Sequence, residues 1–112
     1  MDMLRPGALA EFEAQAAKTA NILKLLANQR RLLILCRLIE SGEMAVSPLA
    51  EAVGLSQSAL SQHLARMREE GLVAARREAQ TIHYRVSDPK VARIIALLAG
   101  LYCPTLKGDQ PG

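Results

Sequence analysis

The stretch from Leu49 to Leu64, LAEAVGLSQSALSQHL, decides the fold. It predicts a short helix that ends near Val53, a tight turn at Gly54, and a second helix that Ser56 caps. Glycine tolerates the positive φ of such a turn, and a serine hydroxyl can accept a hydrogen bond from a free N–H of the first helical turn. Two helices joined by so short a turn are typical of a helix-turn-helix motif.

The second of these helices is expected to run from Gln57 to about Glu70, where Gly71 follows. Its apolar residues recur at helical spacing and predict a buried stripe, whereas its short polar residues gather toward the N-terminus. That end of a recognition helix enters the major groove, where glutamine can read adenine and serine or histidine can bond base edges or phosphates. The predicted DNA-binding residues here are Gln57, Ser58, Ser61, Gln62, His63 and Arg66.

A change of period after Gly71 predicts a two-stranded ribbon. Residues 72–77 can form one strand, and Ile82, Tyr84 and Val86 alternate with polar neighbours as in a half-buried second strand. The expected tip, 78–80, contains no glycine, so the turn signal itself is weak. Four basic side chains of this ribbon would lie beside the minor groove or the phosphates and supply affinity: Arg76, Arg77, His83 and Arg85.

Helices are expected on both sides of this unit. Residues 8–27 form an alanine-rich helix, and Asn28 caps a helix over 29–40 whose buried stripe is Leu32, Leu35, Cys36 and Ile39. Ser47-Pro48 predicts the start of the short helix, with Ser47 as its cap, and Asp88-Pro89 opens the last helix. An apolar stripe on that last helix suits a dimer seam: Val91, Ile94, Ile95 and Leu98.

The order of elements indicates a mainly α fold with a β-hairpin wing, a winged helix-turn-helix. With 112 residues, we expect one domain over 1–112, with its first helix over 8–27, its last over 88–103 and a flexible tail over 104–112. The core must be aliphatic, because aromatic residues make up 3% of the chain.

Basic charge is concentrated where the DNA-reading elements are predicted. The net charge is +3, and residues 56–93 hold seven basic and four acidic side chains, whereas the flanking segments are balanced. A polyanion-binding face needs such an excess, although a solvated surface could also carry it.

Several classes of protein are disfavoured. No apolar run approaches the roughly 20 residues of a membrane span, no secretion signal is visible, and two cysteines without such a signal fit a reducing cytoplasm. We expect no enzyme and no cofactor, because the chain has no catalytic triad pattern, paired catalytic carboxylates or phosphate-binding glycine loop.

The chain resembles the ArsR family of bacterial repressors over roughly residues 18–104. The resemblance is carried by residues 25–28 and 31–35, by Leu55–Leu64, by Glu70–Val73 and by Arg76-Arg77. It implies a homodimer held by the first and last helices, which binds double-stranded operator DNA and represses a small operon until an inducer relieves repression.

The metal sites of many family members are not matched here. One common site uses a Cys-x-Cys pair, at positions held by Ala45 and Ser47 in this chain. Another uses acidic and histidine ligands along the last helix, where this chain offers Asp88 and then Lys90, Leu101 and Pro104. We therefore expect no metal site within one subunit, and a site shared across the dimer stays open.

Two cysteines, Cys36 and Cys103, remain as candidate sensors. Their settings, Ile34-Leu35-Cys36 and Leu101-Tyr102-Cys103, are similar to those of the sulfide- and persulfide-responsive branch of the family, the BigR, SqrR and HlyU type. The resemblance implies that reactive sulfur species or an oxidant link the two sulfurs through a disulfide or polysulfide and release the protein from DNA. Alternatively, Cys36 alone is a small buried hydrophobe of the apolar stripe.

Three other functions remain open at this level. The same fold could sense a metal or metalloid through a site shared across the dimer, or peroxide through a general dithiol. It could also be a dimer that uses the winged fold for protein contacts and does not bind DNA.

Overall fold

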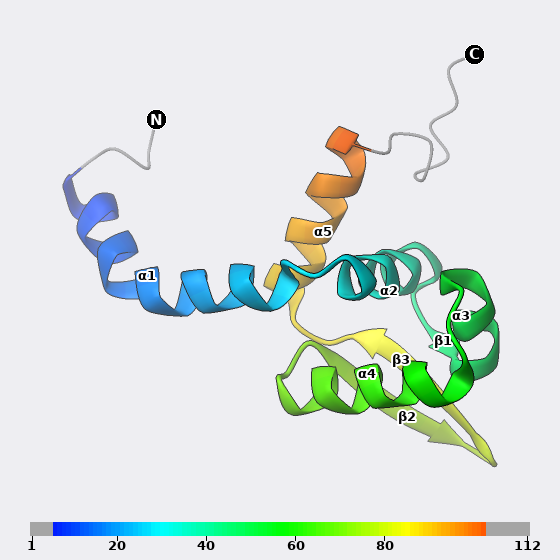
Figure 1. Ribbon diagram of the computed structural model, residues 1–112. Helices are drawn as coiled ribbons and strands as arrows, with labels where there is room; N and C mark the ends of the chain where they lie inside the picture. Colours follow the sequence, from blue (N-terminus) through cyan, green and yellow to red (C-terminus); the bar gives the residue numbers. More distant parts are fainter. Residues whose placement is uncertain (1–5, 103–112) are drawn as a thin grey trace.

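The structure, a computed structural model, describes residues 6–102. The elements follow the order α1 (Pro6–Leu26), α2 (Gln29–Ser41), β1 (Met44–Ala45), α3 (Val46–Val53), α4 (Gln57–Glu69), β2 (Val73–Glu78), β3 (Thr81–Val86) and α5 (Pro89–Tyr102). The strands form one antiparallel sheet in the order β1-β3-β2. The predicted mainly helical fold with a hairpin wing is confirmed (Figure 1).

The helix-turn-helix unit forms as its turn chemistry predicts. Gly54 ends α3 in the left-handed region at φ 72°, and the Ser56 hydroxyl accepts a hydrogen bond from the Ala59 N–H at 3.0 Å. Leu60, Leu64 and Met67 are fully buried and anchor α4 on the core. The recognition helix therefore has a fixed inner stripe and a polar outer face.

The expected start of α3 was wrong. The helix begins at Val46, and its N-cap is Ala45, which makes no side-chain capping hydrogen bond. The preceding residues pair with β3 as strand β1, so the chain enters the helix directly from the sheet. The Ser47 hydroxyl instead accepts a hydrogen bond from the Gln57 side chain at 3.4 Å. A strand of two residues is too short to show a period in the sequence.

The register of the hairpin separates its two faces. Val73 pairs with Val86, and Ala75 pairs with the buried Tyr84, so these residues face the core. Arg76 pairs with His83 on the opposite, outer face, as the predicted alternation requires. At the tip, Ala79 takes a positive φ of 56°, a conformation that glycine would adopt more easily.

The buried face of α2 differs from the predicted stripe. Asn28 caps the helix as expected, with its side-chain oxygen accepting from the Arg31 N–H at 3.1 Å. The fully buried residues are Ile34, Leu35 and Leu38, whereas the other predicted stripe residues, Leu32, Cys36 and Ile39, are half-buried. The helix contacts α3, α5 and β3, so its buried face is centred on Ile34, Leu35 and Leu38 and is wider than the predicted stripe.

The apolar face of α5 divides between the core and the surface. Asp88 caps this helix, as predicted, by accepting from the Lys90 N–H at 2.8 Å. Val91 and Ile95, two of the four predicted seam residues, are at most 1% exposed within a single chain, so the protomer's own core already covers them. The other two, Ile94 and Leu98, are half-buried. Leu97 and Leu101, in contrast, are 62% and 63% exposed.

Helix α1 extends away from the rest of the molecule (Figure 1). Only its last turns join the core, through Ile22, Leu25 and Leu26. The radius of gyration is 16.1 Å, compared with about 13 Å for a compact domain of about 100 residues. The first half of α1 therefore finds no packing partner within the part of the chain that the structure describes. The predicted tail, 104–112, lies outside the described residues.

Candidate nucleic-acid interface and thiol groove

The outer face of α4 presents a continuous set of polar groups. Of the residues predicted to bind DNA on this helix, all are exposed except His63, which is half-buried: Gln57, Ser58, Ser61, Gln62 and Arg66. Because the apolar stripe of α4 packs inward, these side chains point away from the core together. The hydrogen bond from Gln57 to Ser47 also links the beginning of α4 to α3.

A cleft of about 250 Å³ separates this face from the start of α2. Gln62, His63 and Arg66 line it on one side, and Asn28 and Arg31 line it on the other. Together, these residues give the cleft a polar wall beside the recognition helix.

Arg31 holds the two sides of this cleft together. Its guanidinium forms an ion pair with Glu70 at 2.6 Å, donates a second bond to the same carboxylate at 3.1 Å, and donates to the Leu25 carbonyl at 3.2 Å. Only 11% of the Arg31 side chain is exposed. Because it joins the ends of α1 and α4, Arg31 fixes the position of the recognition helix. No local signal in the sequence indicates a pair 39 residues apart.

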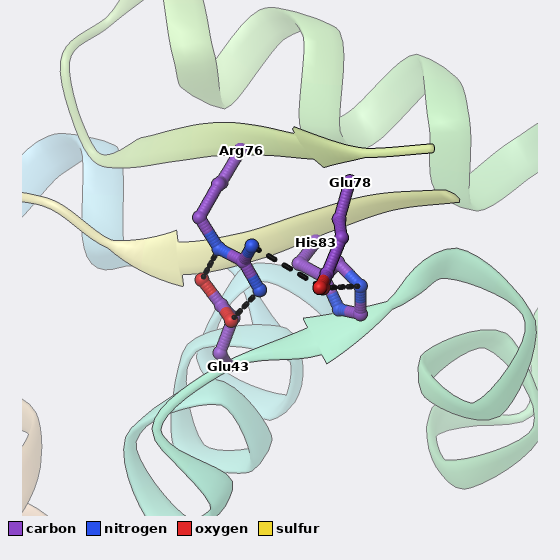
Figure 2. A network of polar contacts seen from close by, with 4 residues as sticks. All are labelled: Glu43, Arg76, Glu78 and His83. Atoms are coloured by element: carbon purple, nitrogen blue, oxygen red, sulfur yellow. Dashed lines mark hydrogen bonds and ion pairs between the residues drawn. The ribbon is translucent and has the colours of Figure 1, made fainter. Parts of the chain in front are cut away.

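The wing carries a second charged network on its outer face (Figure 2). Arg76 of β2 donates through Nε and Nη2 to the two carboxylate oxygens of Glu43, at 3.1 and 2.8 Å. Its Nη1 donates to Glu78 at 3.3 Å, and the His83 ring nitrogen lies 3.8 Å from the same carboxylate oxygen. The hydrogen bond from Arg76 holds the pKa of Glu43 below its ordinary value, and burial opposes this shift. The two carboxylates in turn raise the pKa of Arg76.

The other basic residues of the wing are differently placed. Arg77 and Arg85 are exposed, and within residues 6–102 neither forms an ion pair. The register sets Arg77 opposite Ile82 and Arg85 opposite Ala74, so the two cations start from opposite faces of the ribbon. The structure thus separates the predicted wing cations into two available ones and one that is engaged by carboxylates.

Cys36 lies in an apolar groove of about 640 Å³ between α2 and α5. Leu32 and Leu33 line the groove from α2, and Leu98 and Tyr102 line it from α5. Cys36 is half-buried. The second predicted sensor, Cys103, lies outside the described residues, although Tyr102, which directly precedes it, borders the same groove as Cys36. Among the described residues, no group of three or more His, Cys, Asp or Glu side chains could hold a metal ion.

Comparison with known proteins gives the family. The model of the bacterial regulatory proteins of the arsR family matches residues 28–75, which include the helix-turn-helix unit. The transcriptional activator HlyU of Vibrio cholerae is 50% identical over 98 residues, which cover 88% of this chain and 90% of HlyU. The chain belongs to the arsR family. It is accordingly a transcriptional regulator of that family.

Further relatives agree with this assignment. The biofilm growth-associated repressor of Xylella fastidiosa is 38% identical over 93 residues, which cover 83% of this chain and 81% of the repressor. The structure of reduced HlyU from V. cholerae is similar with a TM-score of 0.76 at 50% identity, over 83% of this chain and 97% of that one. The antimony-specific repressor AntR is similar with a TM-score of 0.74 at 37% identity, over 82% and 83% of the two chains.

Two structural roles in this arsR-family chain were missed by sequence reasoning, those of Arg31 and Glu43. Each forms a side-chain bridge to a residue more than 30 positions away, Arg31 at a separation of 39 and Glu43 at 33.

Within residues 6–102, no helix combines the length and the apolar character that a membrane span requires.

Proposed function

We propose that this arsR-family protein is a homodimeric repressor that binds double-stranded operator DNA in the cytoplasm through α4 and the wing. The exposed polar face of α4, held on a fully buried stripe, supports base reading in the major groove. The exposed Arg77 and Arg85 support contact with phosphates beside it. The repressors BigR of Xylella and AntR favour repression, although HlyU of V. cholerae is an activator.

We further propose that a covalent link between Cys36 and Cys103 lowers DNA affinity. The observation that carries this proposal is the groove that Cys36 shares with Tyr102 at the end of α5. Cys103 is the next residue in the sequence after Tyr102, which lines that groove. A direct disulfide needs Cα atoms about 4.4–6.8 Å apart, and a polysulfide spans a longer gap.

The chemistry balances with an organic persulfide as oxidant. One cysteine thiolate attacks the terminal sulfur of the persulfide RSSH, displaces the thiol RSH, and becomes a protein persulfide. The second thiolate attacks the carbon-bound sulfur of that persulfide and expels hydrogen sulfide, which leaves a disulfide. If both cysteines are first persulfidated, their condensation expels hydrogen sulfide and leaves a trisulfide.

Such a link would join α2 to the end of α5. Because α2 contacts α3 and Arg31 of α2 holds α4 through Glu70, a shift of α2 would move the recognition helix. The two reading heads of a dimer must fit half-sites about 34 Å apart, so a small change in their separation would weaken binding.

The test uses the full chain, reduced, with a duplex from the promoter of its own gene. Fluorescence anisotropy measures DNA affinity before and after addition of glutathione persulfide, and intact mass reports the bridge. We expect the affinity to fall as the bridged mass appears. Cys36→Ser and Cys103→Ser should each bind DNA and ignore the persulfide. Unchanged affinity of the bridged wild type, or no bridge between the two cysteines, would refute the switch.

A metalloid-sensing role is the second candidate, favoured by the likeness to antimony-specific AntR. In one chain, two cysteines offer fewer than the three or four ligands that soft metals prefer, so the site would be shared across the dimer. Release from DNA by antimonite under reducing conditions, without a bridged mass, would select this alternative. Release by hydrogen peroxide as readily as by persulfide would instead select a general dithiol sensor.

A further inference from the structure

The outer face of the wing holds one arginine that two carboxylates already neutralise. We infer that Arg76 is a positioning residue, which clamps the wing to the segment before β1 through Glu43, and that Arg77 and Arg85 neutralise the DNA backbone. This inference rests on the proposed binding of DNA.

Each guanidinium nitrogen of Arg76 already donates to a carboxylate, so three of its five N–H groups are engaged. Nε and Nη2 bond the two oxygens of Glu43 at 3.1 and 2.8 Å, and Nη1 bonds Glu78 at 3.3 Å. This paired arrangement is the favourable one for arginine and carboxylate. The charge of Arg76 is shared by two carboxylates, Glu43 and Glu78, and Arg85 also acts on Glu43 through its charge. A phosphate that approached Arg76 would therefore meet the repulsion of the two carboxylates bound to the same guanidinium.

The clamp connects parts of the sheet that the backbone joins weakly. Strand β1 pairs with β3 over two residue pairs only, and β2 lies on the far side of β3. The Arg76 side chain starts on β2 and crosses the middle strand to reach Glu43, which immediately precedes β1 (Figure 2). The contact therefore spans all three strands.

Beyond β1 the chain passes directly into α3 at Val46. A contact that fixes the wing against Glu43 thus also fixes it against the helix-turn-helix unit. Loss of the contact would let the hairpin pivot relative to α4, so that Arg77 and Arg85 no longer meet the phosphates at the same time as α4 enters the groove.

Salt dependence separates a cation that contacts phosphate from one that positions others. Each neutralised phosphate contributes about −0.9 to the slope of log K against log salt concentration. Binding of a duplex should be measured by anisotropy across a salt series for wild type, Arg76→Gln, Arg77→Gln and Arg85→Gln. We expect Arg77→Gln and Arg85→Gln to make the slope shallower by about 0.9 for each wing that contacts DNA. Arg76→Gln should weaken binding several-fold and leave the slope unchanged.

A charge swap gives the decisive comparison. Glu43→Gln should resemble Arg76→Gln, and the double variant Glu43→Arg with Arg76→Glu should recover most of the lost affinity. The exchanged pair can restore the ion pair between positions 43 and 76. If Arg76 instead contacted a phosphate directly, the negative charge at position 76 would prevent this recovery.

Hydrogen exchange of the β2–β3 amides provides a readout that needs no DNA. Protection should fall in both single variants and return in the double variant, and Glu51→Gln, on the exposed surface of α3, serves as the control. A shallower salt slope for Arg76→Gln, or tighter DNA binding by Glu43→Gln, would overturn the inference, because either result would mean that Arg76 contacts a phosphate. Unchanged protection in the single variants would overturn it too. If the wild type binds no duplex while protection changes as expected, the clamp stands and the proposed function fails.

Discussion

Ser56 occupies the position where one side chain defines the start of the recognition helix. Its hydroxyl accepts a hydrogen bond from the Ala59 N–H at 3.0 Å, which satisfies one of the backbone donors that a helix leaves free at its N-terminus. Asn28 and Asp88 do the same for α2 and α5. At this scale, short polar side chains fix where the elements begin.

Replacement of this cap should destabilise the protein measurably. We expect Ser56→Ala to lower the free energy of unfolding by about 1 kcal/mol, since the alanine cannot accept from the Ala59 N–H. Thermal unfolding should show a loss of several degrees. Ser61→Ala, an exposed serine inside the same helix, is the matched control and should be neutral or slightly stabilising. Equal losses in the two variants would show that Ser56 has no capping role.

Glu43 predicts a pH dependence that can be measured on the folded protein alone. The hydrogen bond from Arg76 lowers the pKa of Glu43 below its ordinary value of 4.5. The folded state therefore favours ionised Glu43, and its stabilising contribution is complete above that value and lost as the pH falls through the lowered pKa.

Urea unfolding of wild type and Glu43→Gln over a pH series checks this sign. The wild type should be more stable near neutral pH, and the difference should shrink as the pH falls below 4.5 and through the lowered pKa of Glu43. Glu51→Gln, an exposed glutamate with no ion pair among the described residues, should show no such trend. If the stability difference between wild type and Glu43→Gln instead grew as the pH fell, the folded state would favour protonated Glu43, which contradicts the prediction.

Among the elements, the sequence predicted most of the features that depend on a regular apolar period or on a nearby capping side chain. The stripe of α4, its serine cap and the alternation of β3 each depend on neighbours within a few residues, and the structure has them. Strand β1 could not be predicted, because two residues carry no period. The Glu43–Arg76 contact joins positions 33 apart, which only the folded sheet brings together. The predicted sensor pair remains a prediction, because Cys103 lies outside the described residues.

The turn between α3 and α4 is the element most sensitive to a single backbone change. Gly54 has a φ of 72°, and a Cβ added there would meet nothing within 4 Å, so the cost of alanine is conformational. We expect Gly54→Ala to lower the free energy of unfolding by about 1–2 kcal/mol, as measured by urea unfolding. Gly7→Ala makes the same chemical change inside α1, where it should be neutral or stabilising. A neutral Gly54→Ala would mean that the turn relaxes to a different angle.

At the scale of the whole molecule, the apolar and the DNA-reading surfaces lie apart. Helices α1 and α5 project from a body that carries α4 and the wing at its other end (Figure 1). Phe12 and Leu23 of α1 are 48% and 54% exposed, and Leu97 and Leu101 of α5 are 62% and 63% exposed. Large exposed apolar side chains on two projecting helices are typical of an association surface.

The last prediction joins this surface to DNA binding. Leu97→Asp places a charge on the exposed face of α5 and should convert a dimer into a monomer, as light scattering after size-exclusion chromatography would show. A monomer has one reading head, so the slope of log K against log salt concentration should fall to about half of the wild-type value. Its affinity should fall by a larger factor, about a hundredfold or more, because the second head no longer binds at high effective concentration. Ser41→Asp adds the same charge at the exposed end of α2 and should leave the salt slope and the DNA affinity unchanged. A Leu97→Asp protein that stays dimeric would place the seam elsewhere, whereas a monomer that keeps the full slope would mean that one protomer makes all the phosphate contacts.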